Sequence, residues 1–151
     1  MTIAPVVKSV DIKAPPARAF TLFAERMGSW WPRGKTVGGK PHADIVVEPH
    51  VGGRWYERDE EGTETPWGQV LVWEPPARLV LGWQLDSSFR FDSDMLTEVE
   101  LAFVALPEGG TRVTLEHRNL ERYGEDAPRI AGLVGPGWGD ILQLFASAAD
   151  A

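Results

Sequence analysis

Apolar and polar side chains alternate along two neighbouring segments, 67–74 and 79–85, which are joined at a Pro-Pro corner. Because successive side chains point to opposite faces of a strand, this pattern predicts two adjacent strands with one apolar face each. These faces carry Trp67, Gln69, Leu71 and Trp73 in the first segment and Leu79, Leu81, Trp83 and Leu85 in the second. A curved sheet with such a face must be closed by another element or must enclose an apolar molecule.

Five other segments predict further strands, because they alternate or are rich in β-branched residues: 6–12, 45–48, 54–58, 97–103 and 112–117. The clearest alternation is in 97–103, where Val99 and Leu101 share one face and glutamates occupy the other. In the last strand His117 follows Leu115 on the apolar face. We therefore expect seven strands, most of them in an antiparallel meander with short turns.

Helical spacing of apolar residues occurs near both ends of the chain. Residues 17–26 predict a short amphipathic helix after two prolines, and 28–32 predicts a second brief helix or turn. This second segment contains two adjacent tryptophans, of which at most one is expected to face inward. Near the C-terminus an apolar helical pattern over 138–149 follows a Gly-Pro-Gly break at 135–137, which would kink the helix.

Composition narrows the classes of function. The 151 residues are enough for one domain, 1–151, and the net charge of −7 argues against nucleic acid or an anionic membrane as a partner. The absence of cysteine excludes disulfides and thiolate chemistry, and the three histidines lack the spacing of a metal motif. We expect neither a metal nor another cofactor. No signal peptide or membrane span is evident, so a cytoplasmic location is expected.

Six short motifs together resemble one known superfamily. They are Ala14-Pro-Pro-Ala17, Ser29-Trp-Trp-Pro32, Gly52-Gly53-Arg54, Trp73-Glu-Pro-Pro-Ala-Arg-Leu79, Gly109-Gly-Thr-Arg-Val113 and Gly137-Trp138. Over nearly the whole chain, their order resembles that of the SRPBCC, or START-like, superfamily, in the branch of homologues of the activator of the heat-shock-protein-90 ATPase. The resemblance implies an α+β helix-grip fold, in which a seven-stranded antiparallel curved sheet wraps around a long C-terminal helix. Two short helices are expected between the first and second strands.

The resemblance also implies a cavity between the sheet and the C-terminal helix. Most relatives bind a lipid, a polyketide, a hormone-like molecule or an aromatic molecule there, and a minority catalyse cyclisation or hydrolysis. The residues that we expect to line the cavity are Trp31, Trp67, Leu71, Leu81, Trp83, Val99, Leu101, Leu115, His117, Trp138 and Leu142. Aromatic side chains also fill cores without any ligand, so plain packing is the alternative for each tryptophan.

Three functions remain open from the sequence. The first is binding of a small hydrophobic or aromatic molecule without catalysis. The second is a cyclase or hydrolase in which His117 and Glu57 exchange protons with the substrate, provided that Glu57 and not Tyr56 faces inward. The third is an interaction module associated with a chaperone. The rings of Phe89 and Phe91 in a polar loop predict a rim of the cavity or the contact surface of a homodimer.

Overall fold

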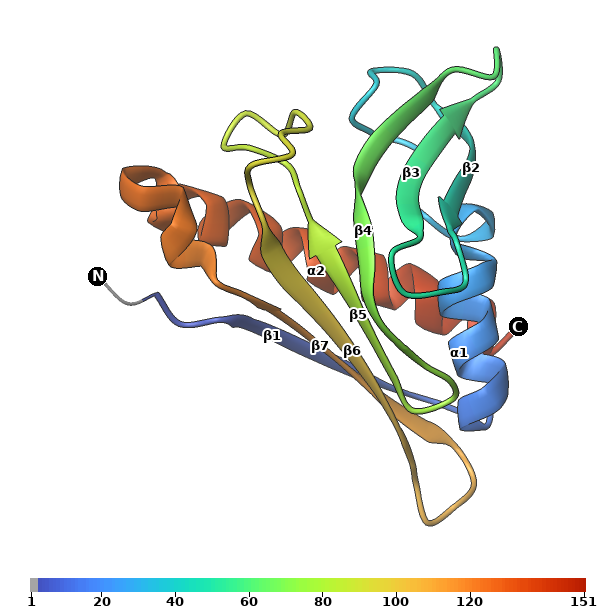
Figure 1. Cartoon of the computed structure of the whole chain (residues 1–151). Helices are drawn as coiled ribbons and strands as arrows, with labels where there is room; N and C mark the ends of the chain where they lie inside the picture. Colours follow the sequence, from blue (N-terminus) through green and yellow to red (C-terminus); the bar gives the residue numbers. More distant parts are fainter. Residues whose placement is uncertain (1–2) are drawn as a thin grey trace.

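The computed structural model describes residues 3–151 as one antiparallel sheet that curves around a long helix (Figure 1). The strands lie in the order β1-β7-β6-β5-β4-β3-β2, and α2 passes behind them in the view of Figure 1. The elements are β1 (Val6–Ile12), α1 (Pro16–Glu25), η1 (Met27–Ser29), β2 (His42–Val47), β3 (Arg54–Asp59), β4 (Glu64–Glu74), β5 (Arg78–Trp83), β6 (Thr97–Ala105), β7 (Thr111–Arg118), η2 (Leu120–Asp126) and α2 (Ala127–Ala149). The predicted helix-grip fold is therefore confirmed.

The apolar core lies between the inner face of the sheet and the two α-helices. The predicted inward residues of β6, Val99 and Leu101, are fully buried, as are Leu115 and His117 of β7. Register explains this agreement, because β6 and β7 pair without a shift along their whole length. Within residues 3–151, no helix combines the length and the hydropathy that a membrane crossing requires.

The predicted break in the C-terminal helix is wrong. α2 is continuous over 23 residues, with Pro136 in its interior. Proline removes one backbone hydrogen bond and leaves the carbonyl oxygen four residues earlier without its helical partner. Both Pro136 and that earlier residue, Gly132, are exposed, so water can bind the free carbonyl. The helix thus continues through the Gly-Pro-Gly segment and presents one long apolar face to the sheet.

The prediction that only one of Trp30 and Trp31 faces inward is also wrong. Each side chain is only 6% exposed. The chain turns at the end of η1, so these neighbours do not alternate as they would in a strand. The indole Nε1–H of Trp30 donates to the carbonyl oxygen of Leu22, and that of Trp31 donates to the carbonyl oxygen of Lys35. Both rings are therefore buried without leaving a donor unsatisfied.

The predicted face of β4 is wrong in its middle, because the pairing of β4 with β5 shifts between Val70 and Val72. This irregularity puts Val70 into the core and leaves Leu71 half-buried. An extra residue in one strand reverses the faces that strict alternation assigns. The sequence pattern contains no mark of this shift, so strict alternation assigns Leu71 to the wrong face.

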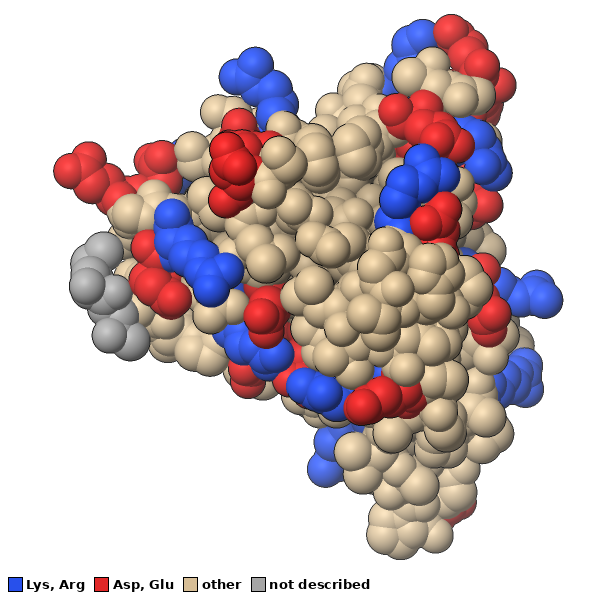
Figure 2. All heavy atoms as spheres, viewed as in Figure 1, with Lys and Arg blue, Asp and Glu red and all other residues tan. Residues whose placement is uncertain are grey.

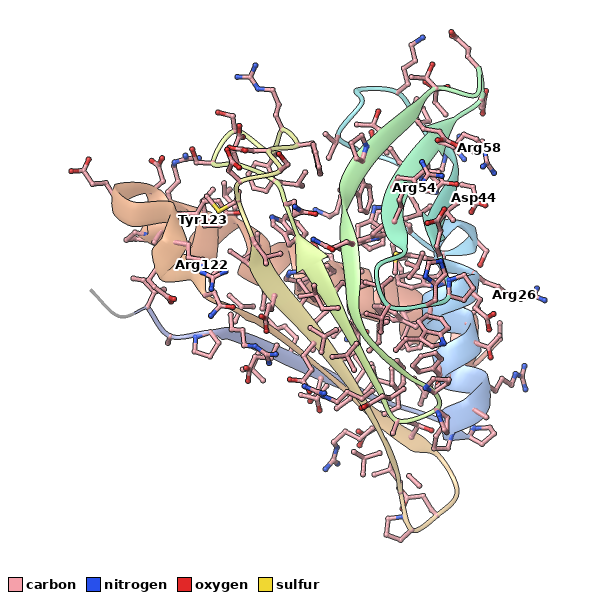
Figure 3. All side chains as sticks on the ribbon, viewed as in Figure 1. Arg26, Asp44, Arg54, Arg58, Arg122 and Tyr123 are labelled. Atoms are coloured by element: carbon pink, nitrogen blue, oxygen red, sulfur yellow. The ribbon has the colours of Figure 1, made fainter. Side chains whose placement is uncertain are left out.

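The third strand resolves an alternative that the sequence left open. Glu57 is 2% exposed, and its carboxylate contacts the indole of Trp67, so it faces inward. Tyr56 lies on the other face, where the guanidinium carbon of Arg54 is 4.3 Å from the centre of its ring. Figure 3 shows Arg54 and Arg58 on the β2–β3 end of the sheet, outside the core.

The face of the sheet turned away from α2 carries ion pairs across β5, β6 and β7. Arg118 contacts Glu98, Glu100 and Glu116, and Arg78 contacts Glu100 as well. Hydrogen bonds from Arg78 and Arg118 lower the pKa of Glu100. In Figure 2, basic and acidic side chains lie next to one another in a band across this face of the molecule. Charge is therefore kept on the outer face, and the inner face remains almost wholly apolar.

We predict that Gly68→Ala destabilises the sheet at its centre. Gly68 pairs with Trp83 of β5, and a Cβ atom at this position would lie 1.7 Å from the carbonyl oxygen of Gly82. Because backbone of a central strand cannot move aside, the variant is expected to lose about 3 kcal/mol of unfolding free energy in urea denaturation. Gly34→Ala is the control, because among residues 3–151 only its own chain neighbours lie within 4 Å of the added methyl group. Equal stability of the two variants would contradict the prediction.

Candidate functional site

A cavity of about 300 Å³ lies between α2 and the inner face of the sheet. The loop before β2 and the loop after β5 both contribute to its wall, and Figure 1 shows these two loops at the same end of the sheet. Its wall is formed by Trp31, Lys35, Thr36, Val37, Trp67, Trp83, Leu85, Phe89, Leu133, Val134, Gly137, Trp138 and Ile141. The wall is therefore mostly apolar, as in typical pockets for small organic molecules.

Four tryptophans form a continuous aromatic wall. The ring of Trp31 lies 5.1 Å from that of Trp67 and 6.0 Å from that of Trp138, and Trp83 lies 5.6 Å from Trp138. The rings meet at tilted or edge-to-face angles, which aromatic pairs prefer over stacking face to face. Each ring is thus held by its neighbours, and the shape of the wall is fixed before any ligand enters.

His117 of β7 lies outside the cavity, next to Trp138, and connects the sheet to α2 through hydrogen bonds. Its Nδ1 accepts a hydrogen bond of 3.1 Å from the indole Nε1–H of Trp138, and its Nε2 lies 2.8 Å from the hydroxyl of Thr97. Because an indole can only donate, the proton of the neutral imidazole must be on Nε2, which donates to Thr97. Burial lowers the pKa of His117 to about 3. The imidazole is therefore neutral at physiological pH, with both nitrogens engaged.

Glu57 fixes the loop that forms the cavity mouth. One oxygen of its buried carboxylate accepts from the Trp67 indole at 2.7 Å and from the backbone N–H of Val37 at 2.5 Å. The other oxygen accepts from the backbone N–H of Gly38 at 3.1 Å. Hydrogen bonds of this kind stabilise a buried carboxylate that has left water. One side chain thereby joins a wall residue on β4 to the loop before β2.

The loop after β5, on the other side of the cavity mouth, is held by Tyr123 of η2. Tyr123 is labelled in Figure 3. Its hydroxyl donates to the backbone oxygen of Leu85 at 2.6 Å, and burial raises its pKa to about 12. Phe89 in this loop has a left-handed backbone with φ of 59°. Its ring packs 6.4 Å from that of Trp83 and belongs to the cavity wall, whereas Phe91 is 39% exposed.

The structure brings together only some of the residues that the sequence singled out. Trp31, Trp67, Trp83 and Trp138 line the cavity. Outside its wall lie the buried core residues Leu81, Val99, Leu101, Leu115 and Leu142, together with Leu71 at the irregularity of β4 and His117 behind Trp138. His117 and Glu57 have different hydrogen-bond partners, so the structure does not form the acid–base pair that was considered.

Much of the wall could not be predicted from the sequence, because it is formed by residues of two loops and of one face of α2. The missed residues are Lys35, Thr36, Val37, Leu85, Leu133, Val134, Gly137 and Ile141. The helical spacing places Ile141 on the apolar face of the last helix, and the rim of the cavity predicted for Phe89 agrees with its position on the wall. Lys35 carried no such signal. Within residues 3–151, no three His, Asp or Glu side chains are grouped as a metal site would require.

Comparison with known proteins shows what the chain is similar to. The sequence profile described as Activator of Hsp90 ATPase homolog 1-like protein matches residues 13–150. Among solved structures, the anthrahydroquino-γ-pyrone synthase Txn09, complexed with SUM, is 40% identical over 97% of both chains, with a TM-score of 0.67. A comparison with curated proteins gives no match.

Two further solved structures are informative. The self-sacrificing resistance protein CalC from Micromonospora echinospora is 34% identical, with a TM-score of 0.70, over 97% of this chain and 94% of CalC. The Aha1 dimer from Colwellia psychrerythraea is 15% identical, with a TM-score of 0.68, over 98% of this chain and 97% of that one. At this lower identity the likeness shows a shared fold alone.

We predict that His117 makes the protein less stable in acid. Its folded pKa of about 3 lies below the unfolded value of 6.5, so the unfolded chain takes up a proton first as pH falls. The contribution of neutral His117 to the free energy of unfolding is fully present above pH 6.5. It is lost progressively between pH 6.5 and 3 and amounts to at most about 5 kcal/mol. Urea denaturation across this range should show a shallower pH dependence for His117→Asn than for the parent protein. Exposed His50 supplies the control His50→Asn, and an unchanged slope in His117→Asn would refute the assignment.

A second prediction concerns Glu57 and the mouth of the cavity. Glu57→Gln replaces an acceptor with an N–H donor that faces the donors of the loop, so the loop should open more often. Loss of a charge-assisted hydrogen bond should raise the equilibrium population of the open loop about tenfold. Trypsin cleavage after Lys35 and Lys40, followed by mass spectrometry, should accelerate to that extent. Glu108→Gln, in an exposed turn, should cleave at the parent rate, and so would Glu57→Gln if the carboxylate did not hold the loop.

Proposed function

The chain belongs to the family of Activator of Hsp90 ATPase homolog 1-like proteins, and we propose that it binds a planar aromatic molecule of polyketide type in the cavity beneath α2. The observation that carries this proposal is the wall of four mutually packed tryptophans around about 300 Å³ of space. Ring faces of indoles attract flat, apolar and polarisable molecules. The volume is at the lower end of about 300–1,000 Å³ for small-molecule sites, which suits a compact fused-ring compound.

The relatives with higher identity support this class of ligand. The structure at 40% identity is named a synthase of an anthrahydroquino-γ-pyrone, and a fused-ring aromatic of that kind is flat and largely apolar. Its likeness extends over nearly all of both chains, including the segments that supply the wall. The name of the Aha1 structure, at 15% identity, transfers no chaperone role to this chain. Formation of a homodimer, for example through exposed Phe91, stays a prediction.

Ring closure of the bound molecule is a second candidate, favoured by the name of the 40% identical synthase. Catalysis would need a proton acceptor at the ligand. His117 is neutral, has both nitrogens engaged and lies outside the wall, so it argues for binding over this route. Incubation of the protein with the substrate of that synthase distinguishes the two functions, since a ring-closed product would establish catalysis and binding without product would exclude it for that compound.

We predict that Gly137→Leu blocks ligand binding without unfolding the protein. Gly137 is on the cavity wall, and an added Cβ would lie 3.8 Å from the flexible Lys35 Nζ, with no other side chain of residues 3–151 within 4 Å. A leucine side chain there would occupy the cavity, while replacement of a helical glycine favours the helix. Binding of neutral 2-(hydroxymethyl)anthraquinone is measured by the quenching of tryptophan fluorescence during a titration. The variant should bind at least about tenfold more weakly, since a loss of about 1.4 kcal/mol of binding free energy raises the dissociation constant tenfold.

Gly132→Leu is the matched control for this experiment. Gly132 lies on the same helix and is exposed, and no side chain of residues 3–151 lies within 4 Å of an added Cβ, but it is not part of the cavity wall. It should bind the probe like the parent protein. Equal binding by both variants would place the ligand elsewhere, and failure of the parent protein to bind this probe and a panel of fused-ring aromatics would refute the proposed function.

A further inference from the structure

Among residues 3–151, Lys35 is the only charged residue on the wall of the cavity. All other wall side chains are aromatic or aliphatic, apart from Thr36, whose hydroxyl donates to the backbone oxygen of Lys40. The chain as a whole has a net charge of −7, so an average position on its surface repels anions. A lone cation at an aromatic cavity in an acidic protein therefore needs a reason.

The neighbouring cations of the same loop have protein partners, and Lys35 has none in the described part of the chain. Arg33 pairs with Glu60 at 3.4 Å, and the Nζ atom of Lys40 lies 2.8 Å from Glu61. No carboxylate among residues 3–151 comes within ion-pair distance of Lys35. Its ammonium group is therefore available to a molecule in the cavity.

The backbone of Lys35 is fixed beside the wall. Its carbonyl oxygen accepts the 2.7 Å hydrogen bond from the indole of Trp31, and its N–H donates to the carbonyl oxygen of Pro32 at 3.2 Å. The carboxylate of Glu57 holds the next part of the loop through the N–H groups of Val37 and Gly38. The ammonium group thus moves only within the reach of its own side chain, next to Gly137 of α2.

We infer that the cavity selects aromatic molecules that carry an anionic oxygen group, such as a carboxylate, which pairs with the ammonium group of Lys35. This inference rests on the proposed function and specifies the chemistry of its ligand. The rings pack against the indoles, and the anionic group points to the mouth beside the loop. An ion pair at the edge of an apolar wall is stronger than one in open water, because fewer solvent molecules screen it. It is still partly exposed, so salt weakens it.

The test compares two probes that share one ring system. Anthraquinone-2-carboxylate and anthraquinone-2-carboxamide are titrated into the full chain by calorimetry at low and at high salt. The parent protein should bind the carboxylate about tenfold more tightly at low salt, a difference within the range for a charge-assisted hydrogen bond, and the preference should shrink at high salt. Lys35→Met retains most of the aliphatic stem and should bind the two probes with equal affinity. Lys35→Arg should retain most of the preference.

Lys40→Met is the control, because it removes a positive charge from the same loop outside the cavity wall. It should keep the preference of the parent protein. Equal affinity of the parent protein for both probes, or a preference that survives in Lys35→Met, would overturn the inference and leave the proposed function standing. Failure of both probes and of the neutral fused-ring panel to bind would instead refute the proposed function itself.

Discussion

The hydrogen bond from the indole of Trp138 to the imidazole of His117 joins α2 to the sheet at the inner end of the cavity. It requires a neutral imidazole, which complete burial provides, and a hydroxyl on β6, which Thr97 provides. Because Trp138 is fixed in this way, Trp31 and Trp83 can pack against its edges. The distance between helix and sheet, and with it the space that remains between them, depends on this contact between two rings.

Glu57 has the corresponding role on the other side of the cavity. A carboxylate that is 2% exposed normally requires a cation or several hydrogen bonds, and here three N–H donors take that part. Two of them belong to the loop before β2, so this buried charge acts as a structural anchor. Considered from sequence as an acid–base partner of His117, Glu57 instead determines where the loop lies and therefore where Lys35 is presented to the cavity.

Regular elements could be predicted from the sequence, and irregular ones could not. Alternation placed Val99 and Leu101 correctly, because β6 pairs with β7 without a shift. The same rule failed at Leu71, because a one-residue shift reverses the face and has no mark in the sequence. The four wall tryptophans were found through their apolar faces. Lys35 was not found, because its place on the wall depends on hydrogen bonds between residues far apart in the chain.

The wall has few polar groups left for a ligand. The indole N–H groups of Trp31, Trp67 and Trp138 are already bonded to a carbonyl, a carboxylate and an imidazole of the protein. These rings therefore offer mainly their faces and edges, which distinguish ligands by shape and flatness and hardly by hydrogen bonding. Discrimination by charge then depends on Lys35, since no other wall residue in the described part of the chain is charged. Shape selection and charge selection are thus assigned to different parts of the cavity, the first to rigid rings and the second to one lysine on an anchored loop.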